Sequence, residues 1–120
     1  MTYDKNNIFA KIIRGEVPSS KVYEDDKVLA FHDISKAAPT HVLVVPKGEY
    51  KNFTDFVTNA SPEESTYFFK KVAAIAKDLK ALDSGFRLIT NSGSDADQTV
   101  EHFHIHILAG KKMGKLLPKN

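Results

Sequence analysis

Three histidines stand at every second position near the end of the chain, at His102, His104 and His106, with apolar residues between them. Successive side chains of a β-strand point to opposite faces, so residues 100–108 predict a strand that carries all three imidazoles on one face. An imidazole titrates near neutral pH and can act as a base, a nucleophile or a metal ligand. The spacing therefore predicts a reactive site on one face and a packed core on the other.

A metal site is the main alternative for this histidine row, since histidine is the commonest metal ligand. Along an extended strand His102 and His106 would lie roughly 13 Å apart, whereas a zinc–nitrogen bond is about 2.0 to 2.1 Å long. Two of the histidines could share a metal, but the third would need another role. The chain has no cysteine and no His-Glu-x-x-His helix. The geometry favours a central reactive histidine with a helper on each side.

Composition excludes several classes of protein. A chain of 120 residues is long enough for one domain, and its 42% hydrophobic and 27% charged residues are typical of a soluble globular protein. The lack of cysteine excludes a disulfide scaffold and thiol catalysis. A net charge of +2 does not indicate binding to nucleic acid or membranes. Residues 1–7 lack the apolar run of a signal peptide, so we expect a cytoplasmic protein.

Periodic patterns predict the helices and strands that surround the histidine row. Apolar spacing predicts a short helix at residues 8–13, and a capping sequence of serine, proline and glutamate begins a long amphipathic helix at residues 61–82. Residues 47–60 have no regular period. Predicted strands occupy residues 21–24, 27–31, 40–45, 86–90 and 100–108. This order predicts an α+β fold with a mostly antiparallel five-stranded sheet, one face of which is covered by helices.

A polar loop leads into the histidine row. Residues 92–99 are mostly small and offer backbone N–H groups, and they end with the amide of Gln98 and the hydroxyl of Thr99. Such a loop is suited to hold an anion beside a nucleophile. At the other end of the row, residues 111–120 carry four lysines, which is typical of a solvated terminus.

Residues 102–108 match the signature of the histidine triad (HIT) superfamily, in which histidines alternate with apolar residues, and the chain resembles that superfamily. Further segments resemble its Hint branch, the histidine triad nucleotide-binding proteins. These segments are residues 8–18, 23–26, 30–34 and 38–47. The similarity covers about residues 8–113, so residues 1–120 are expected to form a single HIT domain with a basic tail.

The resemblance implies a homodimer with a HIT-like fold and two nucleotide sites. It implies hydrolysis of purine nucleoside 5′-phosphoramidates, such as aminoacyl- or lysyl-adenylate-type compounds, to give a nucleotide like AMP, with no metal and no cofactor. Two alternatives remain open. One is a dinucleoside polyphosphate hydrolase, and the other is a nucleotide-binding or regulatory protein with little turnover.

The resemblance also implies catalytic roles. His104, the central histidine, would attack the α-phosphorus and become covalently nucleotidylated. His106 would contact phosphate oxygens, and His102 would help to orient the site together with His41 from a neighbouring strand. A neutral imidazole attacks phosphorus well if its other ring nitrogen donates to a fixed acceptor. The leaving amine also needs a proton, which an adjacent histidine could give.

The nucleotide contacts that the resemblance implies fall on three segments. They are Phe9, Phe31 and Ile34 for the base, Asp33 for the ribose, and Asn91, Gln98 and Thr99 for the phosphate, with Asp97 in the same loop. The chain departs from the Hint pattern at Ala96 and Asp97, where glycines are common. Asp97 would bring a negative charge near the phosphate. Thr99 replaces a serine, and the tail lacks the tryptophan of some relatives, so the specificity for the amine does not transfer.

Overall fold

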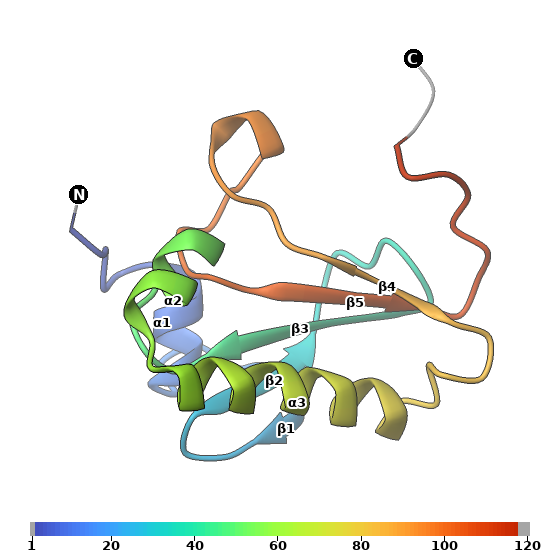
Figure 1. Ribbon diagram of the computed structural model, residues 1–120, viewed down its shortest axis with the longest axis horizontal. Coiled ribbons are helices and arrows are strands. Elements are labelled where there is room, and N and C mark those ends of the chain that lie inside the picture. The colour runs from blue at the N-terminus through green and yellow to red at the C-terminus, as the bar shows by residue number, and fades with distance from the viewer. Residues whose placement is uncertain (1, 118–120) are drawn as a thin grey trace.

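The computed structural model describes residues 2–117. Its centre is a five-stranded antiparallel sheet in the order β1-β2-β3-β5-β4 (Figure 1). The strands are β1 (Lys21–Glu24), β2 (Val28–His32), β3 (Thr40–Pro46), β4 (Phe86–Ile89) and β5 (Ile105–Ala109). The predicted α+β fold with an antiparallel five-stranded sheet is confirmed. β5, which contains His106 and directly follows His104, lies inside the sheet between β3 and β4.

The helices are α1 (Ile8–Ile13), α2 (Phe53–Asn59), α3 (Pro62–Asp78) and the short 3₁₀ helix η1 (Ser94–Ala96). Both predicted helices form, and each begins directly after its N-terminal capping residue. The side chain of Asn7 accepts a hydrogen bond from the backbone of Ala10, and that of Ser61 accepts one from Glu64. None of the helices within residues 2–117 has the length and apolar character needed to cross a bilayer.

The helices differ from the prediction in one additional helix and in one helix end. α2 was not expected, although the Asn52 side chain caps it by accepting a hydrogen bond from the backbone N–H of Asp55 at 2.9 Å. Its seven residues bury only Phe56, which is too few for a recognisable period. α3 ends at Asp78 rather than at residue 82, because the chain turns at Lys80 with a positive φ of 59°.

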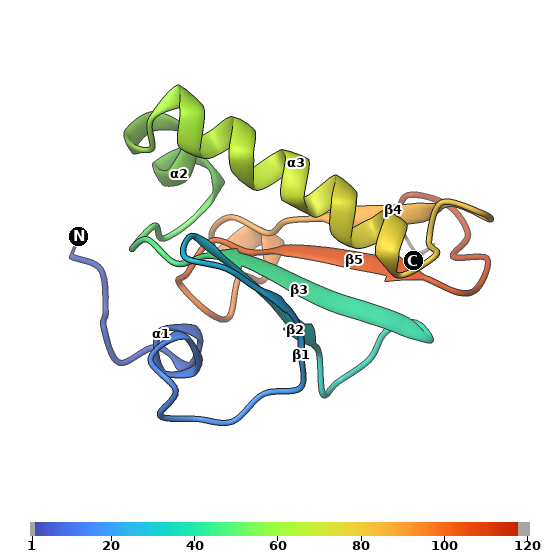
Figure 2. The ribbon, with the colours of Figure 1, turned by 90° about the horizontal axis from the view of Figure 1, so that it is seen from below.

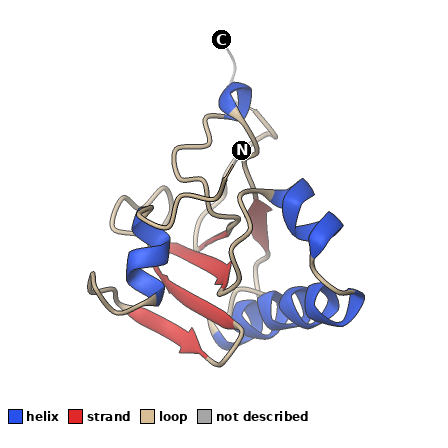
Figure 3. Cartoon of the chain, turned by 90° about the vertical axis from the view of Figure 1, so that its left-hand side faces the viewer, coloured by secondary structure: helices blue, strands red, loops and turns tan. Residues whose placement is uncertain are grey.

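Helices cover both faces of the sheet, which corrects the prediction that they cover one. α2 and α3 lie on one face and α1 lies on the other (Figures 2 and 3). The reason is that β2 and β3 are buried on both sides. Along β2, Val28 packs into the core beneath α3, whereas its neighbour Leu29 packs into a second cluster with Phe9 of α1. A strand that is apolar on both faces needs a cover on each.

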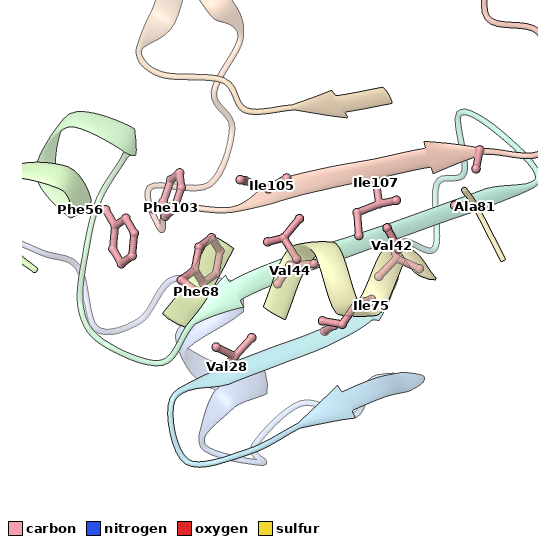
Figure 4. Packing of buried hydrophobic residues seen from close by; sticks show 14 residues of the cluster. Val28, Val42, Val44, Phe56, Phe68, Ile75, Ala81, Phe103, Ile105 and Ile107 are labelled. Atoms are coloured by element: carbon pink, nitrogen blue, oxygen red, sulfur yellow. The ribbon is translucent and has the colours of Figure 1, made fainter. Parts of the chain in front are cut away.

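The core beneath α3 anchors the start of the histidine row. Phe103 stacks on Phe56 of α2, with ring centroids 4.9 Å apart, and both rings contact Phe68 of α3 (Figure 4). Ile105 and Ile107 continue the same buried face along β5. Because these three side chains point into one core, the alternating histidines are directed to the opposite face.

Regular pairing on β5 begins only at Ile105, so the predicted strand over residues 100–108 is too long at its start. β3 and β5 pair from Val44 with Ile105 to Thr40 with Ala109. Before Ile105 the backbone leaves the ladder, and the N–H of Phe103 donates to the carbonyl of Tyr50 at 2.7 Å instead. The alternation of faces continues through this irregular stretch.

Candidate functional site

The histidine row lies on the face that α1 covers. The imidazoles of His104 and His106 lie 5.0 Å apart between ring centroids. Phe9 of α1 packs edge-on against His104 at 4.8 Å and more distantly against His102 at 6.4 Å. His102 and His104 are buried, and His106 is partly buried. His41, at the start of β3, lies beside the row, with its ring 5.1 Å from that of His106.

Backbone carbonyls determine where the protons lie on the first two histidines of the row. Nε2 of His102 lies 2.7 Å from the carbonyl of Pro46, and Nδ1 of His104 lies 2.7 Å from the carbonyl of His102. A carbonyl only accepts, so both ring nitrogens must carry the proton and donate. In neutral His104 the lone pair is therefore on Nε2. This is the arrangement that a nucleophilic imidazole needs.

A backbone N–H determines the proton positions at the other end of the row. The N–H of Ala37 donates to Nδ1 of His41 at 3.0 Å, so neutral His41 carries its proton on Nε2. That nitrogen lies 2.8 Å from Nδ1 of His106 and 3.3 Å from Oδ2 of Asp33. His106 accepts at Nδ1, which leaves its own proton on Nε2. At Nε2, His104 thus offers a lone pair, and the neighbouring His106 offers a proton.

Burial keeps these imidazoles neutral. It lowers the pKa of His102 to about 4, and the partial burial of His106, assisted by the nearby rings of His104 and His41, lowers its pKa to about 4. Burial also lowers the pKa of His104 and of His41, against the opposing effect of the Asp33 carboxylate. At pH 7 the row is thus neutral, and neutral is the state in which His104 can attack an electrophile.

Acidification is expected to destabilise the protein because of these depressed pKa values. Below its usual pKa of 6.5 a histidine of the unfolded chain takes up a proton, whereas His102 in the fold stays neutral down to about pH 4. The unfolded state then binds more protons, so the free energy of unfolding falls with pH through this window. For a fully buried histidine the slope approaches about 1.4 kcal/mol per pH unit. Above pH 6.5 both states are neutral and the slope vanishes.

Urea unfolding followed by circular dichroism measures this dependence, since the chain has no tryptophan for fluorescence. The informative range is pH 6.5 to 4.5, above the range in which depressed carboxylate pKa values such as that of Glu24, about 2, take effect. A free energy of unfolding that stays constant over this range would contradict the assignment of buried neutral histidines.

The residues expected to bind the base and ribose lie near the row. Phe9 and Phe31 contact each other edge-on at 5.7 Å, and both are largely buried in the cluster beneath α1. Ile34 is 99% exposed in the loop after β2. The Asp33 carboxylate is partly buried, 3.3 Å from His41. The Asp33 carboxylate therefore borders the row at the end where His41 and His106 lie, and the apolar ring of Phe9 borders it at His104.

The loop before the row is organised by Gln98. Its side-chain N–H groups donate to the carbonyls of Lys51 and Val100, and its oxygen accepts from the N–H of Gly93. Gln98 thus closes the loop on itself and ties it to the segment before α2. Its side chain is occupied by these bonds in this structure.

The other polar residues of the loop are more open. Asn91 is partly buried, Thr99 is exposed, and Asp97 is exposed with a φ of 59°, a left-handed conformation that glycine adopts more readily. Thr99 also lines a cavity of about 460 Å³ between this loop and the first residues of the chain. The lining of this cavity consists of Thr2, Asp4, Asn7, Ile8, Thr99, Val100 and Glu101.

One group of side chains within residues 2–117 has the composition of a metal site. The ligand atoms of Asp33, His41 and His106 lie within 4.8 Å of one another. They already bond to each other, and the nitrogen of His41 that faces the other two carries a proton. A metal could bind there only by displacing that proton, so the donor set fits a proton relay better than an ion.

Two contacts to the row could not be predicted from the sequence. Tyr3 bonds to His102 from 99 positions away, and the carbonyl of Pro46 bonds to the same ring from the end of β3. No local pattern marks either residue, because both contacts form only when distant segments meet. The contact between Pro46, at the end of β3, and the His102 ring could have been inferred only from the order of the strands in the sheet.

The fold and the row together define the class of this protein. A family model for the HIT domain matches residues 14–113, and the chain belongs to the HIT family. It is 48% identical to a HIT-like protein of Rickettsia prowazekii over 118 residues, which are 98% of each chain.

Solved structures agree with this assignment. A histidine triad protein from Clostridium difficile is 44% identical, with a TM-score of 0.83 over 95% of this chain and 98% of that one. A HIT family hydrolase from Clostridium thermocellum is 42% identical, also with a TM-score of 0.83, over 95% of this chain and 99% of that one. The expected membership of the HIT superfamily and its fold are thus confirmed.

Proposed function

We propose that this protein is a hydrolase that cleaves purine nucleoside 5′-phosphoramidates through a nucleotidyl-histidine intermediate on His104. The observation that carries the proposal is the pair of proton positions on adjacent rings. His104 holds a lone pair on Nε2 because its Nδ1–H donates to the His102 carbonyl, and His106 holds a proton on Nε2. A nucleophile and an acid side by side are what substitution at a P–N bond requires. The similar Clostridium thermocellum protein, named a hydrolase, supports a hydrolytic reaction.

The proposed reaction has two steps. In the first, Nε2 of His104 attacks the phosphorus, the P–N bond breaks, and the amine leaves with the proton from Nε2 of His106. The nucleotidylated His104 ring then carries a positive charge, which balances the negative charge left on the deprotonated His106 ring beside it. In the second, water attacks the nucleotidylated phosphorus, gives its proton to His106, and releases His104 and the nucleoside monophosphate. The N–H of His41 to His106 keeps the acid in the tautomer that the first step needs. Both rings end in their starting states.

The nucleotide is proposed to lie along the row from Asp33 towards the loop. The ribose hydroxyls would donate to the Asp33 carboxylate, and Ile34, with the exposed edges of Phe9 and Phe31, would pack the base. Asn91 and the Thr99 hydroxyl would donate to phosphate oxygens, which would stabilise charge as it develops. The contribution of Gln98 would be to hold the loop, given its three existing bonds. Asp97 would repel the phosphate, which favours moderate affinity for the released nucleotide.

A substrate comparison tests the proposal. Purified protein is given a fluorogenic adenosine 5′-phosphoramidate or a diadenosine polyphosphate, each with and without a metal chelator, and AMP binding is measured in parallel. Chelator-resistant cleavage of the phosphoramidate is the expected result. Cleavage of the polyphosphate alone would support the alternative hydrolase, and AMP binding without any cleavage would support a regulatory nucleotide-binding protein. Activity that chelation abolishes would instead favour a metal held by Asp33, His41 and His106.

We also propose that the protein works as a homodimer in the cytoplasm, without nucleic acid or membrane partners. The support for the dimer is an apolar face that the chain leaves uncovered. Leu88 pairs with Ile107, so their side chains share a face of the sheet. Ile107 is fully buried there, whereas Leu88 is 45% exposed on the edge strand β4. A second copy of the chain could cover this face and the open edge together.

Substitution of Leu88 with aspartate is expected to convert the dimer into a monomer, because a charge at the centre of an apolar contact would lose its water. Size-exclusion chromatography with light scattering measures the mass directly. Val57→Asp, on the exposed side of α2 and equally half exposed, is the matched control and should leave the mass unchanged. A wild-type protein that elutes as a monomer at micromolar concentration would contradict the proposed dimer.

A further inference from the structure

Tyr3 contacts the histidine row although it lies outside every segment that the proposed reaction uses. Its hydroxyl lies 2.5 Å from Nδ1 of His102, and its ring packs edge-on against the imidazole with centroids 5.6 Å apart. Because Nε2 of His102 donates its proton to the Pro46 carbonyl, Nδ1 holds the lone pair. The Tyr3 hydroxyl is therefore the donor, and both nitrogens of the His102 ring are engaged.

The segment that carries Tyr3 is fixed by further contacts. Lys5 forms an ion pair with Glu49, in the segment after β3, at 2.9 Å. The Arg14 guanidinium donates to the backbone carbonyl of Lys5 at 2.8 Å. Burial raises the pKa of Tyr3, so its hydroxyl keeps its proton at neutral pH. Tyr3 is thus placed against His102 by a docked segment and remains a donor throughout the working pH range.

The stretch that Tyr3 contacts is the one that the sheet does not hold. His102 precedes β5, whose pairing with β3 begins at Ile105. Yet the backbone carbonyl of His102 is the acceptor that orients the His104 ring. The side chain of His102 is held by the Tyr3 hydroxyl and the Pro46 carbonyl. The next residue, Phe103, is held by the hydrogen bond from its N–H to the Tyr50 carbonyl. Two bonds of the His102 side chain and one backbone bond to Tyr50 thus replace the ladder at this point.

We propose that Tyr3 is a positioning residue for the nucleophile. Its hydroxyl holds the His102 ring, the ring fixes the backbone at this position, and the His102 carbonyl then keeps the proton of His104 on Nδ1 and the lone pair on Nε2. The inference rests on the proposed function for its kinetic consequence. Its structural consequence, a single tautomer of His104, is independent of any substrate.

Tyr3→Phe tests this role, since it keeps the ring and removes only the hydroxyl. We expect kcat for the adenosine phosphoramidate to fall roughly 10-fold, while KM stays within about twofold, as for loss of a group that orients a reactive histidine. Nitrogen-15 NMR of the imidazoles should show the single Nδ1–H form of His104 in the wild type and a mixture of the two tautomers in the variant. A purely structural role would not change the tautomer.

Tyr23→Phe is the matched control, because its hydroxyl donates to Asp25 at 2.6 Å in the β1–β2 hairpin, away from the row. It should leave kcat and the His104 signals unchanged. Wild-type kcat with an unchanged His104 tautomer in Tyr3→Phe would overturn the proposal, and so would an equal fall of kcat in both variants. If the wild type cleaves no phosphoramidate, the proposed function fails, and the NMR comparison alone still decides the role of Tyr3.

Discussion

Replacing His104 with alanine is expected to lower the turnover of an adenosine phosphoramidate by about 10⁴-fold or more, as when the nucleophile of a covalent mechanism is removed. No other ring of the row can take its place. His102 donates Nε2–H to Pro46 and accepts from Tyr3, and His106 carries its proton on Nε2 where an attacking lone pair would be needed. Fold should be retained, because the core side chains on the opposite face are untouched.

Two measurements check this expectation. Steady-state turnover gives the loss of activity, and mass spectrometry of acid-quenched reactions detects the nucleotidylated protein, which should be present in the wild type and absent in His104→Ala. The matched control is His32→Ala. His32 pairs with Val42 and so faces the core beneath α3, on the other side of the sheet from the row. An adduct on the His104→Ala protein, or turnover equal to that of the control, would refute His104 as the nucleophile.

Replacing His106 with alanine is expected to slow cleavage of the P–N bond by roughly 10²- to 10⁴-fold, the usual contribution of a general acid. An amine is a poor leaving group until it is protonated, and the Nε2–H of His106 is the proposed proton source. A nucleotide ester that releases p-nitrophenolate needs no such proton, because that anion is stable in water. The same variant should therefore cleave the ester with a much smaller loss.

The ratio of these two losses is the measurement. His106→Ala leaves His41 with Asp33 as the remaining acceptor for its N–H, at 3.3 Å, so the neighbouring ring keeps a partner. The Tyr23→Phe protein, altered far from the row, should show no difference between the two substrates. Equal losses for the phosphoramidate and the ester would mean that His106 binds the phosphate but gives no proton to the amine.

Several elements could be predicted from the sequence because their signals are local. The caps of α1 and α3 act within four residues of the chain, and the β-branched run of β3 favours its own conformation. The short helix α2 was missed because one buried residue gives no period. The helical cover on the second face was missed because an apolar run such as β2 can be buried on one side or both. Only the sheet order, with β2 and β3 inside, decides between them.

The candidate site was also predicted only in part from the sequence. The resemblance placed Asp33, His41 and the row at one site, and the fold brings them together. It also assigned Gln98 to the phosphate, whereas the structure engages that side chain with Lys51, Val100 and Gly93. Which partner an amide takes depends on the approach of the segment before α2. No pattern near Gln98 carries that information.

The sequence was sufficient to predict that three imidazoles share one face and that apolar side chains share the other, because the two-residue period of extended backbone is a property of the local chain. Contacts between distant segments determine where the protons lie on His102, His41 and His106. Those positions depend on Tyr3, Ala37 and Pro46, which are brought to the row from three other segments. A ring nitrogen donates or accepts according to its partner, so three chemically equal histidines acquire different roles only in the folded chain.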